Sequence, residues 1–153
     1  MLPPMSEGIA LSAVARGTLL PEAQRLARLD EALPQIEAVL EGETDAVALQ
    51  STLAVGPYQG SMGCLRIDFA RGVCGACART ATVQHIDDVH SFPGHIACDD
   101  RSRSELVLPV VARGELRAVL DLDSPHVAGF SAAEADRLLA LLTRVFDRAE
   151  VVY

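Results

Sequence analysis

The sequence predicts an α+β fold, with an antiparallel sheet and with the N- and C-terminal helices packed on one face of it. Leucine and isoleucine recur at helical spacing over residues 22–40. Short β-like runs separated by Gly, Pro and Asp fill residues 52–123. Ser131 and Glu134 then form a capping box ahead of a second helical pattern. The order helix, strands, helix is typical of α+β domains.

The first predicted element is a helix over residues 22–40. Pro34 lies inside this helical run and predicts a kink or a break. Gly42 is suited to end the helix. Residues 1–20 show no strong periodicity, which predicts a flexible leader ahead of a single domain over residues 21–153. The apolar face of the predicted helix consists of Leu26, Leu29, Leu33, Ile36 and Leu40.

The middle of the chain predicts several short strands. Residues 52–55 form one β-like run, and residues 64–69 alternate polar and apolar side chains. Residues 106–111 and 116–122 flank an Arg-Gly pair at 113–114, which predicts an antiparallel hairpin. These strands supply the sheet of the predicted α+β fold.

The composition excludes several classes of protein. The chain has 153 residues, 13 basic and 21 acidic, with a net charge of −8. This excess of acid disfavours nucleic acid and anionic membranes as partners. All basic residues are Arg, which excludes Schiff-base lysines and P-loop lysines. Neither a membrane-spanning apolar run nor a secretory signal is evident, so we expect a soluble, cytoplasmic protein with reduced cysteines.

Four cysteines are candidates for chemistry. Glycines on both sides of Cys74 and the polar surroundings of Cys98 predict that both thiols are exposed in loops. One interpretation is a zinc site built from Cys74, Cys77, His95 and Cys98, whose spacing suits a tetrahedral metal. The other is thiol redox chemistry, in which Cys64, Cys74 and Cys98 converge and form a disulfide.

Three carboxylates form a second candidate group. Asp121 and Asp123 are two residues apart on a predicted strand, so their side chains share one face. Glu105 begins the neighbouring strand of the hairpin. One interpretation is a solvated strand end. The other is an acidic pocket, in which mutual repulsion raises the pKa of at least one carboxyl group and the negative charge holds a substrate ammonium.

Six motifs follow one another along the chain: GETD at 42–45, GPYQG at 56–60, ARGVCG at 70–75, DVHSFPGHIACD at 88–99, RSELVLP at 103–109 and AVLDLDSP at 118–125. They resemble the motifs of the free methionine-(R)-sulfoxide reductases, a family built on the GAF fold. The resemblance spans about residues 22–150. It implies a GAF-type sheet, a homodimer, no cofactor, and reduction of free L-methionine-(R)-sulfoxide with thioredoxin as the reductant.

The resemblance also implies residue roles. Cys98 stands at the position of the attacking cysteine, and Cys64 and Cys74 stand at the positions of resolving cysteines. Cys77 has no role in the family pattern. The acidic residues of the family, which engage the sulfoxide and the ammonium, correspond to Glu105, Asp121 and Asp123.

The chain departs from the family pattern in one segment. Only residues 46–55 join the GETD motif to GPYQG, which predicts an internal deletion before Gly56 and the loss of one strand. That strand carries the Trp and Tyr that enclose the substrate methyl group in the family. The chain has no Trp, so Phe69, Phe92 or a dimer partner would have to supply the wall.

Three functions therefore remain open. An active reductase needs an acid beside the cysteine, because a sulfoxide sulfur is a poor electrophile until its oxygen is protonated. The other two are a ligand-binding or redox-sensing GAF module and a zinc-stabilised structural domain.

Overall fold

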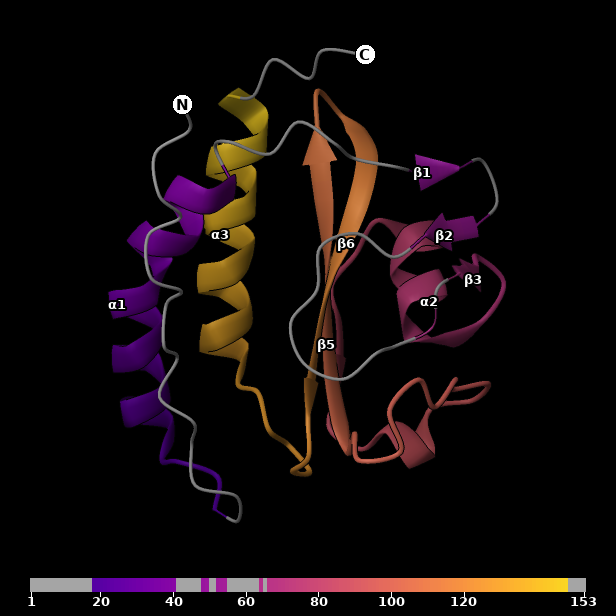
Figure 1. Ribbon diagram of the computed structural model, residues 1–153, viewed down its shortest axis with the longest axis horizontal. Coiled ribbons are helices and arrows are strands. Elements are labelled where there is room, and N and C mark those ends of the chain that lie inside the picture. Colours follow the sequence, from indigo (N-terminus) through magenta and orange to yellow (C-terminus); the bar gives the residue numbers. More distant parts are fainter. Residues whose placement is uncertain (1–17, 41–47, 50–51, 55–63, 65, 149–153) are drawn as a thin grey trace, which may run out of the picture.

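The computed structural model describes residues 18–40, 48–49, 52–54, 64 and 66–148 (Figure 1). In chain order its elements are the helix α1 (Glu22–Leu40), the strands β1 (Ala48–Leu49), β2 (Thr52–Ala54) and β3 (Arg66–Asp68), the helix α2 (Gly72–Thr80), the strand β4 (Gln84–Ile86), a short 3-10 helix (Val89–Ser91), the strands β5 (Ser104–Ala112) and β6 (Glu115–Ser124), and the helix α3 (Ala132–Arg148).

The strands form two antiparallel three-stranded sheets, in the orders β1-β2-β3 and β4-β5-β6. Figure 1 shows α3 against one face of the β5–β6 hairpin, with α1 beside α3, and α2 on the opposite face near β2 and β3. The central strand β5 is therefore covered on both faces, and eight of its nine residues are buried. The α+β prediction with both terminal helices on one side is confirmed.

The core is divided between the two faces of β5. Leu106 and Leu108 belong to the cluster that packs on α3, and Leu29 and Leu33 of α1 join it. Val107, between them in sequence, belongs to the other cluster, which packs on α2. This alternation follows from the two-residue period of a strand.

The hairpin of β5 and β6 is the longest paired unit in the described chain. Its register runs from Ser104 opposite Ser124 to Ala112 opposite Glu115. The two residues of the turn, Arg113 and Gly114, have φ values of 54° and 76°. Two positive φ values in a two-residue loop match the twist of the flanking strands.

Three ion pairs join α1 to α3 along their length. Each runs between an arginine and a carboxylate on opposite helices, and the residue numbers rise together on both helices, so the helices run in the same direction. The pairs are Arg25–Glu134 at 2.9 Å, Asp30–Arg137 at 2.5 Å and Glu37–Arg144 at 2.6 Å.

The start of α3 confirms the predicted capping box. The Ser131 backbone N–H donates to a Glu134 carboxylate oxygen at 2.8 Å, and the Glu134 N–H contacts Ser131 Oγ at 3.3 Å. The same carboxylate accepts hydrogen bonds from the Arg25 guanidinium. Burial acts to raise the pKa of Glu134, but the bonds from Arg25 and Ser131 outweigh it, so the pKa is lowered.

Several expectations need correction. The helix α1 continues through Pro34, so the chain does not break there. Cys74, expected in an exposed loop, lies in the helix α2, and neither this helix nor the short strand β4 was predicted. Among the described residues, the strands are hydrogen-bonded in two sets of three. None of the described helices is both long enough and apolar enough to cross a membrane.

Some expectations fall outside the described residues. They concern residues 1–17 of the predicted leader, the helix end at Gly42 and most of the shortened segment before Gly56. The leader and the single domain over residues 21–153 stay predictions. Within the described residues, β6 has one hydrogen-bonded neighbour, β5.

We expect Glu134→Gln to lower the free energy of unfolding by about 2 kcal/mol. The substitution weakens both a charge-assisted hydrogen bond and a helix cap. The side chains of Arg25 and Glu134 are only 16% and 10% exposed, so solvent screens the pair little. Urea unfolding of both proteins measures the difference.

The control is Glu115→Gln. Glu115 pairs with Arg117, but its side chain is 70% exposed, so the loss should be no more than about 0.5 kcal/mol. Equal losses in the two variants would contradict the role given to Glu134.

Candidate active site

The helix α2 approaches the preceding turn more closely than a side chain would allow. A Cβ atom at Gly75 would lie 2.7 Å from the Phe69 carbonyl oxygen and 2.8 Å from that of Asp68. Arg79 donates a hydrogen bond to the same Phe69 oxygen. Gly72, at the start of the helix, has a φ of 65°, which glycine adopts most readily. These contacts fix α2 against the sheet and direct Cys74 toward β5 and β6.

The hairpin register places the carboxylates opposite α2. Glu105 lies opposite Asp123, and Val107 lies opposite Asp121. Val107 packs toward α2, so the three acidic residues, which share its face, point the same way. The prediction that Asp121 and Asp123 share one face is confirmed, and Glu105 joins them.

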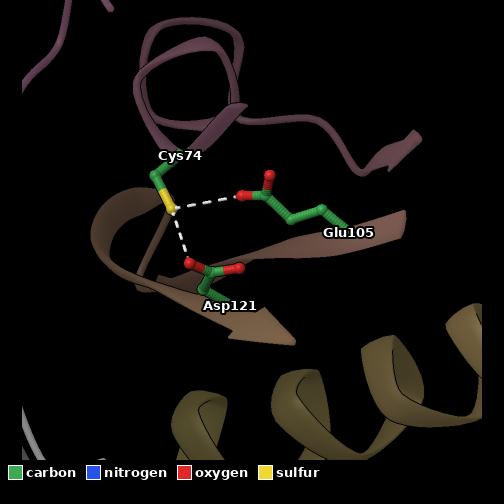
Figure 2. A group of neighbouring side chains, drawn as sticks. All are labelled: Cys74, Glu105 and Asp121. Atoms are coloured by element: carbon green, nitrogen blue, oxygen red, sulfur yellow. Dashed lines mark hydrogen bonds between the residues drawn. The ribbon is translucent and has the colours of Figure 1, made fainter. Parts of the chain in front are cut away.

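The Cys74 thiol lies beside two of these carboxyl groups (Figure 2). Its Sγ lies 3.1 Å from Asp121 Oδ2 and 3.9 Å from Glu105 Oε1. Cys74 and Glu105 are buried, with 5% and 6% of their surface exposed, whereas Asp121 opens toward solvent. The expectation that Cys74 is an exposed loop thiol is therefore wrong, because α2 carries it into the protein.

Burial and neighbouring charges keep Glu105 and Cys74 protonated. Burial and then the charges of Asp121 and Asp123 raise the pKa of Glu105 to about 9. Burial, and then the charge of Asp123, raise the pKa of Asp121 to about 6. Burial and the Asp121 charge raise the pKa of Cys74 far above its ordinary value. At neutral pH, Glu105 is a neutral acid and Cys74 is a thiol that donates to Asp121.

His95 lies beside Glu105 on the loop that leads to Cys98. Its Nε2 is 3.7 Å from Glu105 Oε2, and 14% of its side chain is exposed. Burial, followed by the nearby His90, lowers the pKa of His95, so the ring is neutral at pH 7. The sequence suggested His95 only as a zinc ligand, and its place beside Glu105 was not predicted.

Cys64 and Cys98 form a disulfide, with their Cα atoms 5.2 Å apart. Cys64 lies two residues before the start of β3, and Cys98 lies in the loop between the 3-10 helix and β5. Beside Cys98, Arg101 forms an ion pair with Asp99 at 2.6 Å. The disulfide brings together two of the three cysteines that were expected to converge.

A cavity joins these groups. Cys98, Cys74, Glu105, Asp121 and Asp123 all line it, so five of the six predicted site residues share one space and the sixth, Cys64, is bonded to Cys98. The rest of the lining is formed by Ile67, Gly72, Val73, His95, Ile96, Asp99 and Ser102.

The apolar part of the cavity differs from the expectation. Ile67 and Ile96 line it, whereas Phe69 and Phe92 pack against the α2 core cluster. Aromatic character suggested the two phenylalanines, but the sequence gives no signal for which apolar side chains turn inward. Ile67 lies in the alternating β3 run, which was the only pattern that could have indicated it.

The predicted zinc ligands are not brought together as a set. Cys98 is bonded to Cys64, and Cys77 is fully buried in the α2 core cluster. Burial, and then Asp121, raise the pKa of Cys77 to about 12, so it stays a thiol. Cys77 therefore acts as a core residue in the described structure.

The chain belongs to the GAF domain family, which matches residues 12–152. Several of its relatives within that family are named free methionine-R-sulfoxide reductase, as the motifs predict. The protein of that name from Escherichia coli is 45% identical over 94 residues, which are 61% of this chain and 57% of the relative. The one from Saccharomyces cerevisiae is 40% identical, over 58% of this chain and 50% of its own length.

Solved structures extend the similarity to the fold. The free methionine-R-sulfoxide reductase of Neisseria meningitidis, in complex with its substrate, matches with a TM-score of 0.74 and 35% identity over 83% of this chain and 91% of that one. The chain therefore spans nearly all of this structure but only 50–57% of the two curated relatives.

We expect the stability of the protein to fall as pH rises, and Glu105→Gln to reduce that slope. The pKa of Glu105 is about 9 in the folded protein, against about 4.3 in an unfolded chain. Between these values the folded state binds more protons, so the free energy of unfolding decreases by up to about 1.4 kcal/mol per pH unit. Denaturant unfolding from about pH 5 to about pH 8 measures this slope.

Glu115→Gln is the matched control, since Glu115 is exposed at the far end of the same hairpin. In this variant the free energy of unfolding should decrease with pH as steeply as in the wild type. A Glu105→Gln variant whose pH dependence equals that of the wild type would show that Glu105 is ionised in the folded protein at neutral pH.

Proposed function

We propose that this protein reduces free L-methionine-(R)-sulfoxide to L-methionine by cysteine chemistry. The observation that carries the proposal is the placement of Cys98, bonded to Cys64, at a cavity that also holds Glu105 and Asp121. The similarity to proteins named for this activity supports the same reaction.

The carboxylates suit a small zwitterion. Asp121 and Asp123 offer negative charge at the open side of the cavity, where a substrate ammonium would be attracted. Ile67 and Ile96 offer apolar surface for the methionine side chain. This division assigns the amine to the strand β6 and the methyl group to the surface of Ile67 and Ile96.

Glu105 is the proposed proton donor. With a pKa of about 9 it retains its proton at neutral pH, and it lines the same cavity as Cys98. Protonation of the sulfoxide oxygen makes the sulfur electrophilic, and a positioned acid contributes about 10²–10⁴-fold to such a step.

The proposed reaction conserves atoms and electrons. Cys98 attacks with its thiolate, the sulfoxide gives up its oxygen, and the products are methionine and a Cys98 sulfenic acid. The Cys64 thiol then displaces water from that sulfenic acid and forms the Cys64–Cys98 disulfide. The sum is one sulfoxide and two thiols converted to one thioether, one disulfide and one water. Cys64 is thus the resolving cysteine, and Cys74 is a hydrogen-bond partner of Asp121.

A dithiol must then reduce the disulfide, and we propose thioredoxin for this step. We also propose a cytoplasmic location, because dithiols are kept reduced there. We also propose a homodimer. Its interface would exclude Leu29 and Leu33, because they pack into the cluster shared with α3.

The first test is turnover by cysteine variants. NADPH consumption coupled through thioredoxin reductase and thioredoxin should require free L-methionine-(R)-sulfoxide and should be lost in Cys98→Ser. Cys64→Ser should form about one methionine per chain without reductant and should then turn over slowly. Cys77→Ala is the control with wild-type turnover, since Cys77 lies in the core.

A folded Cys98→Ser variant with wild-type turnover would contradict the proposed reaction. The disulfide also fits a redox sensor. Peroxide would then form the Cys64–Cys98 bond in the reduced protein, and sulfoxide would yield no methionine.

The second test concerns the acid. Glu105→Gln should lower kcat by about 10²–10⁴-fold, because the amide cannot supply the proton. Wild-type kcat should fall as pH rises above about 9, where Glu105 loses its proton. Asp136→Asn, at an exposed position of α3, should leave kcat unchanged. Wild-type kcat in Glu105→Gln would exclude Glu105 as the donor.

A further inference from the structure

The proposed reaction moves a proton at two residues of the cavity. Cys98 must lose its thiol proton before it attacks the sulfoxide, and Glu105 must regain the proton that it donates. Glu105 is buried, with 6% of its surface exposed, so it has little direct access to water. A group that accepts the first proton and returns it to Glu105 would meet both needs.

His95 lies where such a group is needed. It lines the same cavity as Cys98, three residues before it in the chain. Its Nε2 atom lies 3.7 Å from Glu105 Oε2, whereas the Cys74 Sγ lies 3.9 Å from the other oxygen, Oε1. Each Glu105 oxygen thus has its own neighbour, and of the two neighbours the imidazole is the one that exchanges protons readily near neutral pH.

The loop between the 3-10 helix and β5 fixes the position of His95. Gly94 precedes it with a φ of 76°, a backbone conformation that favours glycine. The His95 backbone N–H donates to the Phe92 carbonyl oxygen at 3.1 Å. The Cys98 N–H donates to the Ile96 carbonyl oxygen at 2.9 Å. These two tight turns hold His95 and Cys98 on one short loop at the cavity.

The charges around the cavity favour a histidine as the proton acceptor. Among the described residues of the lining, His95 is the only basic one. Arg101, further along the loop, is bound to Asp99. A thiolate is disfavoured among carboxylates unless a cation lies next to it, and a protonated imidazole is such a cation. The acidic side chains of the lining belong to Asp99, Glu105, Asp121 and Asp123.

His95 is neutral before it accepts the proton. Burial lowers the pKa of His95, the nearby His90 lowers it further, and Asp123 on β6 raises it. At pH 7 the imidazole is therefore able to act as a base. The other ionisable groups that line the cavity are Cys74 on α2, Cys98 and Asp99 on the loop, Glu105 on β5 and Asp121 on β6.

We propose that His95 is a proton relay that transfers the proton of the Cys98 thiol to Glu105, a role that rests on the proposed function. The imidazole first takes the proton from the thiol, which leaves a Cys98 thiolate beside an imidazolium. Glu105 then protonates the sulfoxide oxygen while the thiolate attacks the sulfur. The products are methionine, the Cys98 sulfenic acid and a Glu105 carboxylate.

The imidazolium then returns its proton to the Glu105 carboxylate. No proton is exchanged with water, and no electron passes through His95. The ring is neutral again before Cys64 forms the disulfide. His95 thus acts through Cys98 and Glu105 and not on the sulfoxide.

The first test measures the Cys98 thiolate without substrate. It uses the full, reduced chain with Cys64→Ser, and follows alkylation by iodoacetamide from about pH 5 to about pH 9, on both sides of the ordinary pKa of a histidine. Peptide mass spectrometry separates Cys98 from the buried Cys74 and Cys77. Addition of His95→Gln should raise the apparent pKa of Cys98 toward about 8.5 and slow its alkylation at pH 7 by about 10-fold, because an amide accepts no proton.

The second test measures the first turnover. In the same reduced Cys64→Ser chain, His95→Gln should slow the formation of the first methionine by at least about 10-fold at pH 7. The difference should shrink as the pH approaches about 8.5, where the thiol ionises without a base. Added imidazole should restore the rate in His95→Ala, which a purely structural role of His95 does not predict.

His126→Gln is the matched control, because His126 is not part of the cavity lining. It should keep both the alkylation profile and the rate of methionine formation. Circular dichroism should show that each variant is folded. An unchanged alkylation profile in His95→Gln, or a slowed turnover that neither higher pH nor imidazole restores, would overturn the proposed relay.

The relay and the proposed function fail separately. If His95→Gln changes the alkylation of Cys98 as expected but no variant forms methionine, His95 is the base for Cys98 and the proposed reaction is wrong. If the wild type forms methionine and His95→Gln leaves both measurements unchanged, only the relay is wrong.

Discussion

The register of the β5–β6 hairpin is the constraint on which the other features depend. Side chains along a strand alternate between faces, so the register decides which residues meet α2 and which meet α3. In the observed register Leu106 and Leu108 pack on α3, while Glu105 and Asp121 face α2. A slip of one residue would bury carboxylates among leucines. The two-residue turn pairs Ala112 with Glu115, and a register shift between Val110 and Val111 then sets the pairing of the strand ends that carry Glu105 and Asp121.

The helix α2 completes the arrangement from the other side. It can lie close to the preceding turn because Gly75 has no side chain, and it brings the Cys74 thiol to the carboxylates. Three acidic side chains can share this space because they are not all charged. Glu105, with a pKa of about 9, is neutral at pH 7 and relieves the repulsion. The proton that Glu105 retains therefore allows the three side chains to lie close together, and it is also the proton that the proposed reaction needs.

Much of the fold followed from periodicity, and the failures have physical causes. The long patterns at α1, α3 and the hairpin were strong enough to predict. Residues 72–80 contain two glycines and few large apolar side chains, so the helix α2 depends on tertiary contacts that a local pattern does not contain. The strand β4 has three residues, too few to show alternation.

The sequence identified the residues that make up the candidate site, but not which of them are in contact with one another. The resemblance of the motifs identified all six residues, but the spacing of residues along the chain does not show where each side chain points in the folded protein. Cys74 and Cys77 look equivalent in sequence, yet α2 turns one toward the carboxylates and the other into the core. The choice of Cys64 as the partner of Cys98 is likewise a matter of three-dimensional proximity.

The Cys64–Cys98 bond has a mechanical effect as well as a chemical one. Its ends are 34 residues apart, and the segment between them contains both α2 and β4. Closing a loop of this size removes unfolded-state entropy equivalent to about 4 kcal/mol in the chain-entropy treatment. Breaking the bond removes this constraint, so that α2 then depends on its packing and on hydrogen bonds such as the one from Arg79 to the Phe69 carbonyl oxygen. The oxidation state of one sulfur pair therefore changes how firmly the segment that carries the Cys74 thiol is held.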